Sequence, residues 1–137
     1  MELTNRIACA VGVALMLATF VSLHAQLPGP QTGFKRTVVQ QGDLSAPGRE
    51  VVQAIAEIQP GGQSGAHTHP GEEVAYVLEG TVELEMQGKP AVSKKAGDAF
   101  IVPAGTVHNA KNTGKTVAKV LGTYIVEKGK PVATPVK

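Results

Sequence analysis

Residues 34–128 contain no stretch in which apolar residues recur every 3.6 positions, as they would along an amphipathic helix. Short β-prone runs recur instead, each bounded by turn-forming residues. They cover 34–40, 51–58, 74–79, 81–87, 91–95, 99–102 and 117–127. Polar and apolar side chains alternate over 81–86, which is typical of a strand with one face in solvent. The pattern predicts a single all-β domain, a sandwich or a barrel.

The amino-terminal segment, residues 1–25, is of a different kind. A short head with Arg6 precedes an apolar run from Ile7 to Leu23, and the small residue Ala25 follows. This order is that of a secretory signal peptide, so we expect a signal-peptide helix, cleavage after Ala25 and a periplasmic or secreted protein. The alternative is an uncleaved membrane anchor, because the run approaches the roughly 18 residues that can cross a bilayer.

Two further segments flank the strand-rich region. Residues 26–33 are rich in turn formers and are interpreted as a linker or N-terminal arm. Residues 129–137 contain two prolines and a glycine and are expected to form a flexible tail. The barrel domain is therefore predicted to occupy residues 34–128.

Charge and cysteine content exclude several classes of protein. Lys and Arg number 13 and Asp and Glu number 11 in 137 residues, so the net charge of +2 gives no reason to expect a nucleic-acid partner. The single cysteine, Cys9, lies in the segment that we expect to be cleaved, and no intrachain disulfide is possible. The mature chain would then depend on packing or on a metal for its stability, and after cleavage no membrane association is expected.

Three histidines lie in the strand-rich region. His67 and His69 are two positions apart, so on a strand their side chains project from the same face. Glu73 follows beyond a Pro-Gly turn, and His108 comes after a second turn far along the chain. Three neutral imidazoles and one carboxylate suit one divalent transition metal ion (iron, manganese, nickel, copper or zinc), with positions left open. The alternative is that these are ordinary surface or core histidines.

The spacing around these residues extends over two longer patterns. The first is Gly61-x5-His67-x-His69-x3-Glu73-x6-Gly80, and the second is Gly97-x5-Pro103-x-Gly105-x2-His108-x3-Asn112. They resemble the two signature motifs of the cupin superfamily, and the 16 residues between them resemble the short spacer of small single-domain, quercetin-dioxygenase-like cupins.

The resemblance implies a small antiparallel jelly-roll barrel whose mouth holds a metal. The implied metal ligands are His67, His69, Glu73 and His108, and a homodimer is also implied. Strand alternation should turn Glu72 outward and leave Ala75 and Val77 inside the barrel. Gly80 is expected at a tight turn with positive φ, and Asn112 is expected to cap a turn.

A fold alone does not determine an activity. The small apolar pocket expected beside the ligands favours a metal-dependent, dioxygenase-like oxygenase that acts on a small organic substrate. Glu73 would be its catalytic residue and would take a proton from the substrate. One alternative is a non-catalytic module that binds a metal or a small ligand. Another is a sugar-directed isomerase or epimerase, which would need a more polar pocket.

Overall fold

The computed structural model describes residues 30–137, which form strands and turns. Within this range no helix is long and apolar enough to cross a membrane. The expected signal-peptide helix and its cleavage after Ala25 lie outside the described residues.

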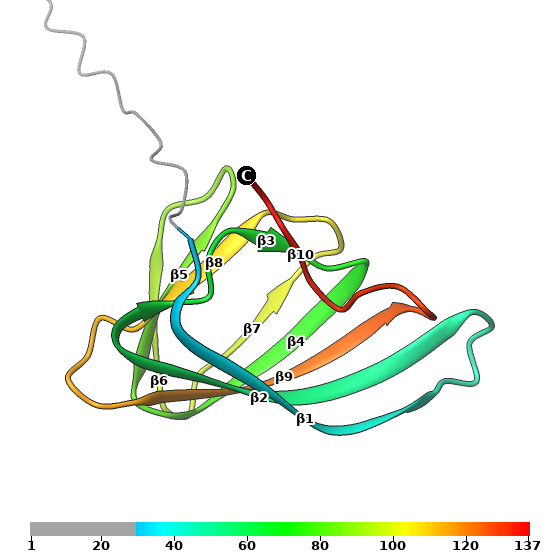
Figure 1. The fold of residues 1–137 in the computed structure, drawn as a ribbon, viewed down its shortest axis with the longest axis horizontal. Coiled ribbons are helices and arrows are strands. Elements are labelled where there is room, and N and C mark those ends of the chain that lie inside the picture. Colours follow the sequence, from blue (N-terminus) through cyan, green and yellow to red (C-terminus); the bar gives the residue numbers. More distant parts are fainter. Residues whose placement is uncertain (1–29) are drawn as a thin grey trace, which may run out of the picture.

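The described residues form ten strands. They are β1 (Thr32–Asp43), β2 (Arg49–Gln63), β3 (His67–Thr68), β4 (Gly71–Glu79), β5 (Thr81–Met86), β6 (Val92–Lys95), β7 (Ala99–Val102), β8 (His108–Lys111), β9 (Ala118–Glu127) and β10 (Thr134–Pro135). All pairings are antiparallel, in the order β10-β3-β8-β2-β9-β4-β7, with β1 on β2, β5 on β8 and β6 on β5. The sheet curls into a nearly closed barrel, so the predicted all-β architecture is confirmed (Figure 1).

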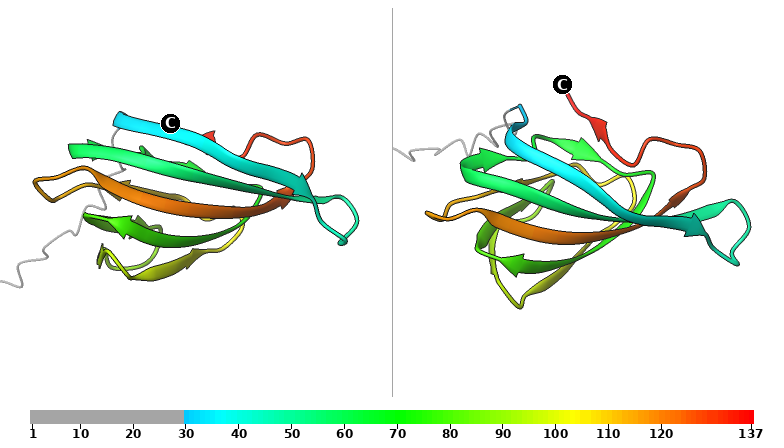
Figure 2. Two further views of the ribbon diagram at one scale, coloured as in Figure 1. Left: turned by 90° about the horizontal axis from the view of Figure 1, so that it is seen from below. Right: turned by 60° about the horizontal axis from the view of Figure 1, so that its bottom comes forward.

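The longest pairings build the curved layer that carries most of the core. β2 pairs with β9 from Arg49↔Glu127 to Ile58↔Ala118, and β9 pairs with β4. Figure 2 shows these strands side by side, with β1 along the outer edge of β2. Every second residue is buried over 50–58 of β2, 71–77 of β4 and 118–126 of β9, as expected for strands with one face turned inward.

Two adjoining groups of small and branched side chains fill the barrel. One contains Ala56, Ile58, Ala75, Val77, Val82, Ala118 and Val120, and the other contains Val52, Ala54, Tyr124 and Val126. The expectation that Ala75 and Val77 face inward is confirmed, since they are 1% and 0% exposed. Burying each valine or isoleucine contributes roughly 1.5–3 kcal/mol to stability. Several of these side chains are only alanines, and one of them, Ala56, lines a small cavity beside the core.

The turn between β4 and β5 depends on glycine. Gly80 has a φ of 73°, and a Cβ there would lie 2.9 Å from the Cα of Ala118. Both the left-handed backbone and the close approach exclude a side chain, so the positive φ predicted for this residue is confirmed.

The carboxyl-terminal segment contributes a short strand. Within residues 129–137, β10 pairs with β3 through Thr134↔Thr68 and Pro135↔His67. The amide of Val136 also donates a hydrogen bond to the Ala66 carbonyl, over 2.9 Å. Part of the segment that we expected to be a flexible tail therefore lies along the strand that begins with His67.

Candidate metal centre

The sheet brings together the four side chains that the two motifs single out. His67 on β3 stands directly opposite His108 on β8 in the register of the two strands. His69 follows β3, and Glu73 points inward from β4, while Glu72 is exposed as alternation predicted. All four side chains are buried, with residue exposures of 2–7%.

The three imidazoles point at one another across a small space. One ring nitrogen from each of His67, His69 and His108 lies within 4.8 Å of the others. Glu73 completes the group, because its Oε2 lies 3.2 Å from the Nε2 of His69 and 3.2 Å from the Nε2 of His108. Residues from β3, β4 and β8 that are distant in sequence thus share one site.

Main-chain carbonyls fix the orientation of all three rings. The Nδ1 of His67 lies 2.8 Å from the Gly65 oxygen, that of His69 lies 2.5 Å from the Val132 oxygen, and that of His108 lies 3.0 Å from the Thr106 oxygen. Because a carbonyl only accepts, each Nδ1 carries the proton and donates it. Each Nε2 is then left with a lone pair that faces the shared space, as in histidines that bind metals.

This donor set has the chemistry of a metal site. The Nε2 of His69 is buried and has no hydrogen-bond partner among the described residues. Lone pairs on the imidazoles and a carboxylate oxygen repel one another at such short distances unless a cation or a shared proton lies between them. Three imidazoles and one carboxylate are ligands that first-row transition metals accept, so the residues fit such an ion.

The charge states of the site also suit a cation. Burial, together with the nearby charge of His108, lowers the pKa of His67 from 6.5 to about 4, so this ring is neutral at physiological pH. Burial acts to raise the pKa of Glu73, but the close approach of the His108 and His69 rings, which favour the ionised carboxylate whenever they carry a proton on Nε2, outweighs it and holds that pKa well below its usual range. The site therefore presents an ionised carboxylate beside a neutral imidazole.

Two spaces adjoin the histidines. An inner cavity of about 30 Å³, room for one or two waters, borders Glu73, His67 and His108. Most of its other walls are apolar, and these apolar walls come from Phe34, Ala56, Ile58, Leu84, Phe100, Ala110 and Val120. A larger pocket of about 510 Å³ opens outward from His67, between the start of β1 and residues 133–137.

Sequence reasoning missed three polar residues of this cavity, Ser64, Arg36 and Tyr124, and the last two have the larger side chains. Arg36 and Tyr124 lie on β1 and β9, outside both motifs. Alternation along 120–126 could have placed Tyr124 inside the barrel, but only the register of β1 on β2 shows that Arg36 points inward. Asn112 lies away from the imidazoles, and its amide donates to the carbonyls of Ile58 and Thr116, which confirms its expected structural role.

Comparison with known proteins agrees with this geometry. Residues 54–130 match the family of the cupin domain. The chain belongs to the cupins. A germin-like protein, subfamily 2 member 1 of Arabidopsis thaliana, is 31% identical over 129 residues, which cover 88% of this chain and 59% of that protein. The cupin described here thus spans about three-fifths of the length of that curated relative.

Solved structures share the fold of this cupin. A Klebsiella pneumoniae protein with a double-stranded β-helix domain superposes with a TM-score of 0.64 at 22% identity, covering 81% of this chain and 91% of that one. An oxalate oxidase in complex with the substrate analogue glycolate gives a TM-score of 0.60 at 24% identity, covering 76% and 55%. These similarities confirm the jelly-roll barrel that the two motifs implied.

Proposed function

We propose that this cupin binds one divalent transition metal ion through His67, His69, Glu73 and His108 and catalyses the oxygen-dependent conversion of a small organic substrate. One observation carries the proposal. Three imidazole Nε2 atoms, freed by the hydrogen bonds at Nδ1, converge with a carboxylate beside a cavity whose other walls are mostly apolar. Iron, manganese, nickel, copper and zinc all accept this donor set.

The residues around the site have separable roles in such a reaction. A divalent ion held there would supply a Lewis acid and, if redox-active, a centre that exchanges electrons with dioxygen. Glu73 is ionised and can accept a proton from the part of a substrate that reaches the cavity from the outer pocket. The apolar walls exclude water from the reacting groups, which strengthens electrostatic interactions there.

Tyr124 supplies a neutral phenol beside these groups. Burial and then the charge of the Glu73 carboxylate raise the pKa of Tyr124 above its ordinary value. The phenol therefore keeps its proton at physiological pH and can donate a hydrogen bond to a substrate oxygen. It does not act as a second base.

Two other functions compete with this proposal. A non-catalytic module that binds a metal or a small ligand would use the same four side chains. A sugar-directed isomerase or epimerase would need a second acid–base pair, and Glu73 is the one carboxylate among the described residues that line the inner cavity. The oxidase activity in the name of one structural neighbour fits an oxygen-dependent reaction better than an isomerase or epimerase.

Metal content and oxygen uptake test the proposal together. The full chain, purified from a host that exports it, should hold about one transition metal ion and consume oxygen with a substrate from a panel of flavonols, catechols and β-diketones. Glu73→Gln should abolish uptake, whereas Glu72→Gln, which removes the neighbouring outward carboxylate, should preserve it. Bound metal without uptake under any of the five metals would favour the binding module.

Export of the protein rests on residues 1–25. We propose that this segment directs secretion and is removed after Ala25, because a charged head, an apolar run and a small residue follow one another there. Intact-mass measurement of the protein from its own compartment should show the loss of 25 residues. A full-length chain in the membrane fraction would instead support the anchor.

Homodimer formation, which the resemblance to cupins implied, is supported by apolar side chains on the outside of the barrel. Val74, Tyr76 and Leu78 on β4 are 40–47% exposed, and Ile101, which pairs with Val74, is 59% exposed. We propose that this face joins two copies. Light scattering should give twice the chain mass, and Ile101→Lys should halve it.

A further inference from the structure

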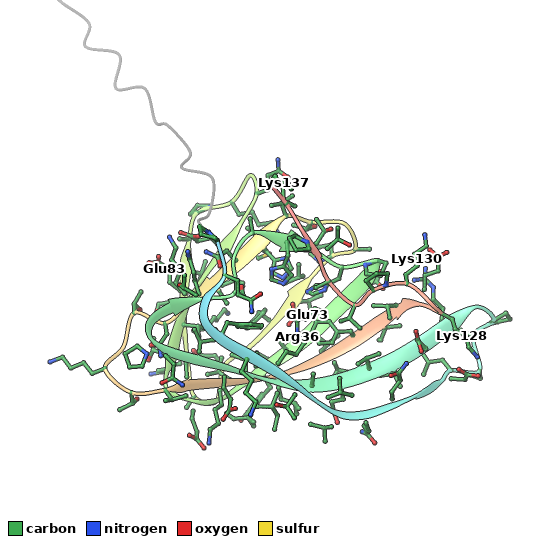
Figure 3. All side chains as sticks on the ribbon, viewed as in Figure 1. Arg36, Glu73, Glu83, Lys128, Lys130 and Lys137 are labelled. Carbon is green, nitrogen blue, oxygen red and sulfur yellow. The ribbon has the colours of Figure 1, made fainter. Side chains whose placement is uncertain are left out.

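Arg36 is held inside the barrel by two aromatic rings. Its Cζ lies 5.2 Å from the centroid of the Phe34 ring and 5.5 Å from that of the Tyr124 ring. Figure 3 shows Arg36 and Glu73 together within the ring of strands. Stacking of a guanidinium against aromatic faces fixes its position while leaving its N–H groups free for a ligand.

The guanidinium has no anionic partner. Within residues 30–137, no carboxylate forms an ion pair with Arg36, and its Nε is buried without a hydrogen-bond partner. By contrast, the neighbouring Lys35 points outward, with a side chain that is 74% exposed and an ion pair to Glu57. A buried donor with nothing to bind is unfavourable, and such groups recur where a ligand supplies the missing acceptor.

Arg36 stands where the two spaces of the site meet. It lines both the inner cavity and the outer pocket, together with Phe34, Ser64 and His67. A molecule that moves from the outer pocket towards Glu73 therefore passes the guanidinium.

The charges of this passage favour an anion. Among residues 30–137, no aspartate or glutamate lines the outer pocket, and Glu73 is the one carboxylate that lines the inner cavity. With a divalent ion in place, Glu73 would cancel one of its two charges, and Arg36 would add one more. The loaded site would then carry an excess of positive charge that a neutral substrate leaves uncompensated.

We propose that Arg36 is a substrate-binding residue and that the substrate is a small organic carboxylate. Its carboxylate accepts hydrogen bonds from the guanidinium, whose planar donors match the two oxygens, and the rest of the molecule reaches towards Glu73 and the histidines. This assignment rests on the proposed function for the reaction, but it concerns binding and can be tested without turnover.

Calorimetric titration of the zinc-loaded protein isolates binding, because zinc is not redox-active. The ligands are lactate, succinate and benzoate, each compared with its neutral amide. At least one carboxylate should bind ten or more times as tightly as its amide. Arg36→Gln should weaken carboxylate binding tenfold or more, and Arg36→Lys should restore part of it. Lys35→Gln, the matched loss of one outward charge on the same strand, should change it less than twofold.

Two controls keep the test decisive. Zinc content is measured in every variant, so that a lost metal is not mistaken for a lost contact. Arg36→Met should keep the melting temperature of the ligand-free protein, because a methionine can retain the apolar contacts with Phe34 and Tyr124 and the guanidinium has no anionic partner there. A lower melting temperature would mark Arg36 as a structural residue and contradict the proposal.

The outcomes separate this inference from the proposed function. If carboxylates and amides bind alike, if neither kind binds, or if Arg36→Gln changes nothing, the assignment is wrong, even if a neutral substrate consumes oxygen. If carboxylates bind through Arg36 but no compound of either panel supports oxygen uptake, the assignment stands and the oxygenase proposal fails.

Discussion

The direction in which each imidazole of the site can bind a cation is set by a main-chain carbonyl. Gly65 and Thr106 each precede the histidine that they orient by two residues, so these two contacts are local. Val132 is 63 residues from His69, so the third contact depends on the fold. The spacing of the histidines could reveal which residues gather, but it could not reveal which nitrogen of each ring stays free.

The metal-free protein should lose stability as the pH falls from 6.5 to about 4. The folded-state pKa of His67 is lowered to about 4, so the unfolded chain binds a proton across this window while the folded chain does not. The stability contributed by the neutral ring is complete above pH 6.5 and declines by on the order of 3 kcal/mol towards pH 4.

Urea unfolding of the metal-free chain at a series of pH values measures this slope. The pKa of Glu73 is also lowered, so protonation of this carboxylate at low pH destabilises the folded chain too. That loss of stability begins only as the pH falls below about 4.5, the pKa of this group in the unfolded chain. His67→Asn should flatten the slope between pH 6.5 and 4.5. An unchanged slope in that variant would assign the titration to another group.

The ring of Tyr124 lies over a position that has no side chain. A Cβ on Gly122 would lie 2.6 Å from the Tyr124 Oη and 2.7 Å from its Cζ. Gly122→Ala must therefore displace a buried phenol and should cost about 1–3 kcal/mol. Gly42→Ala on β1, where a Cβ meets nothing within 4 Å, is the matched control and should be nearly neutral.

A double-mutant cycle tests the stated cause. With Tyr124→Val present, Gly122→Ala should cost clearly less, because no ring remains to be displaced. Equal costs in both backgrounds would show that the strain arises elsewhere on β9.

At the scale of strands, β-prone runs predicted most elements, including the four-residue strands β6 and β7, and missed β3, β8 and β10. β2, β4, β5 and β9 contain the branched residues and the alternation that identify strands. β3 and β10 have two residues each, and β8 consists of His, Asn, Ala and Lys, so no local preference identifies them. They exist because neighbouring strands supply their hydrogen bonds, and two of these three strands adjoin the site through His67 and His108.

The carboxyl-terminal segment should contribute to metal affinity. Deletion of residues 131–137 removes the Val132 carbonyl that orients His69 and the strand that pairs with β3. Loss of such an outer contact lowers metal affinity by about 10–100-fold in comparable sites. Competition with a chromogenic chelator measures the change.

A shorter deletion serves as the comparison. Removal of residues 134–137 takes away β10 but keeps Val132, so affinity should fall less than in the longer deletion. If the two truncated chains and the intact chain bind metal equally, the carbonyl does not help to position His69.

For the molecule as a whole, metal binding should stabilise the barrel. The four side chains come together only in the folded chain, so an ion present at a hundredfold excess over its Kd adds about 2.7 kcal/mol. Chelator treatment should therefore lower the melting temperature by several degrees in calorimetry. His108→Ala, which removes one of the four, should show a much smaller shift. The same shift in both proteins would place the stabilising ion elsewhere.

The whole architecture was more predictable than the composition of its cavity. Turn spacing and the two motifs indicated a barrel and brought four residues to one end of it. Alternation along β9 could have placed Tyr124 inside the barrel, whereas Arg36 follows from a strand pairing that no local pattern contains. The motif residues thus indicated which side chains could hold a metal. The pairing of the strands showed which other side chains face that site.

Both ends of the described chain border the outer pocket, since Pro30 and Gln31 line it together with residues 133–137 (Figure 1). Anything fused after Lys137 starts at the rim of that pocket. A polyhistidine purification tag would place competing imidazoles beside the pocket that His67 lines. Metal analysis of such a fusion would then count ions that belong to the tag. The loop between β1 and β2, with the exposed residues 45–48, is at the opposite end of the barrel and offers a safer place for a handle.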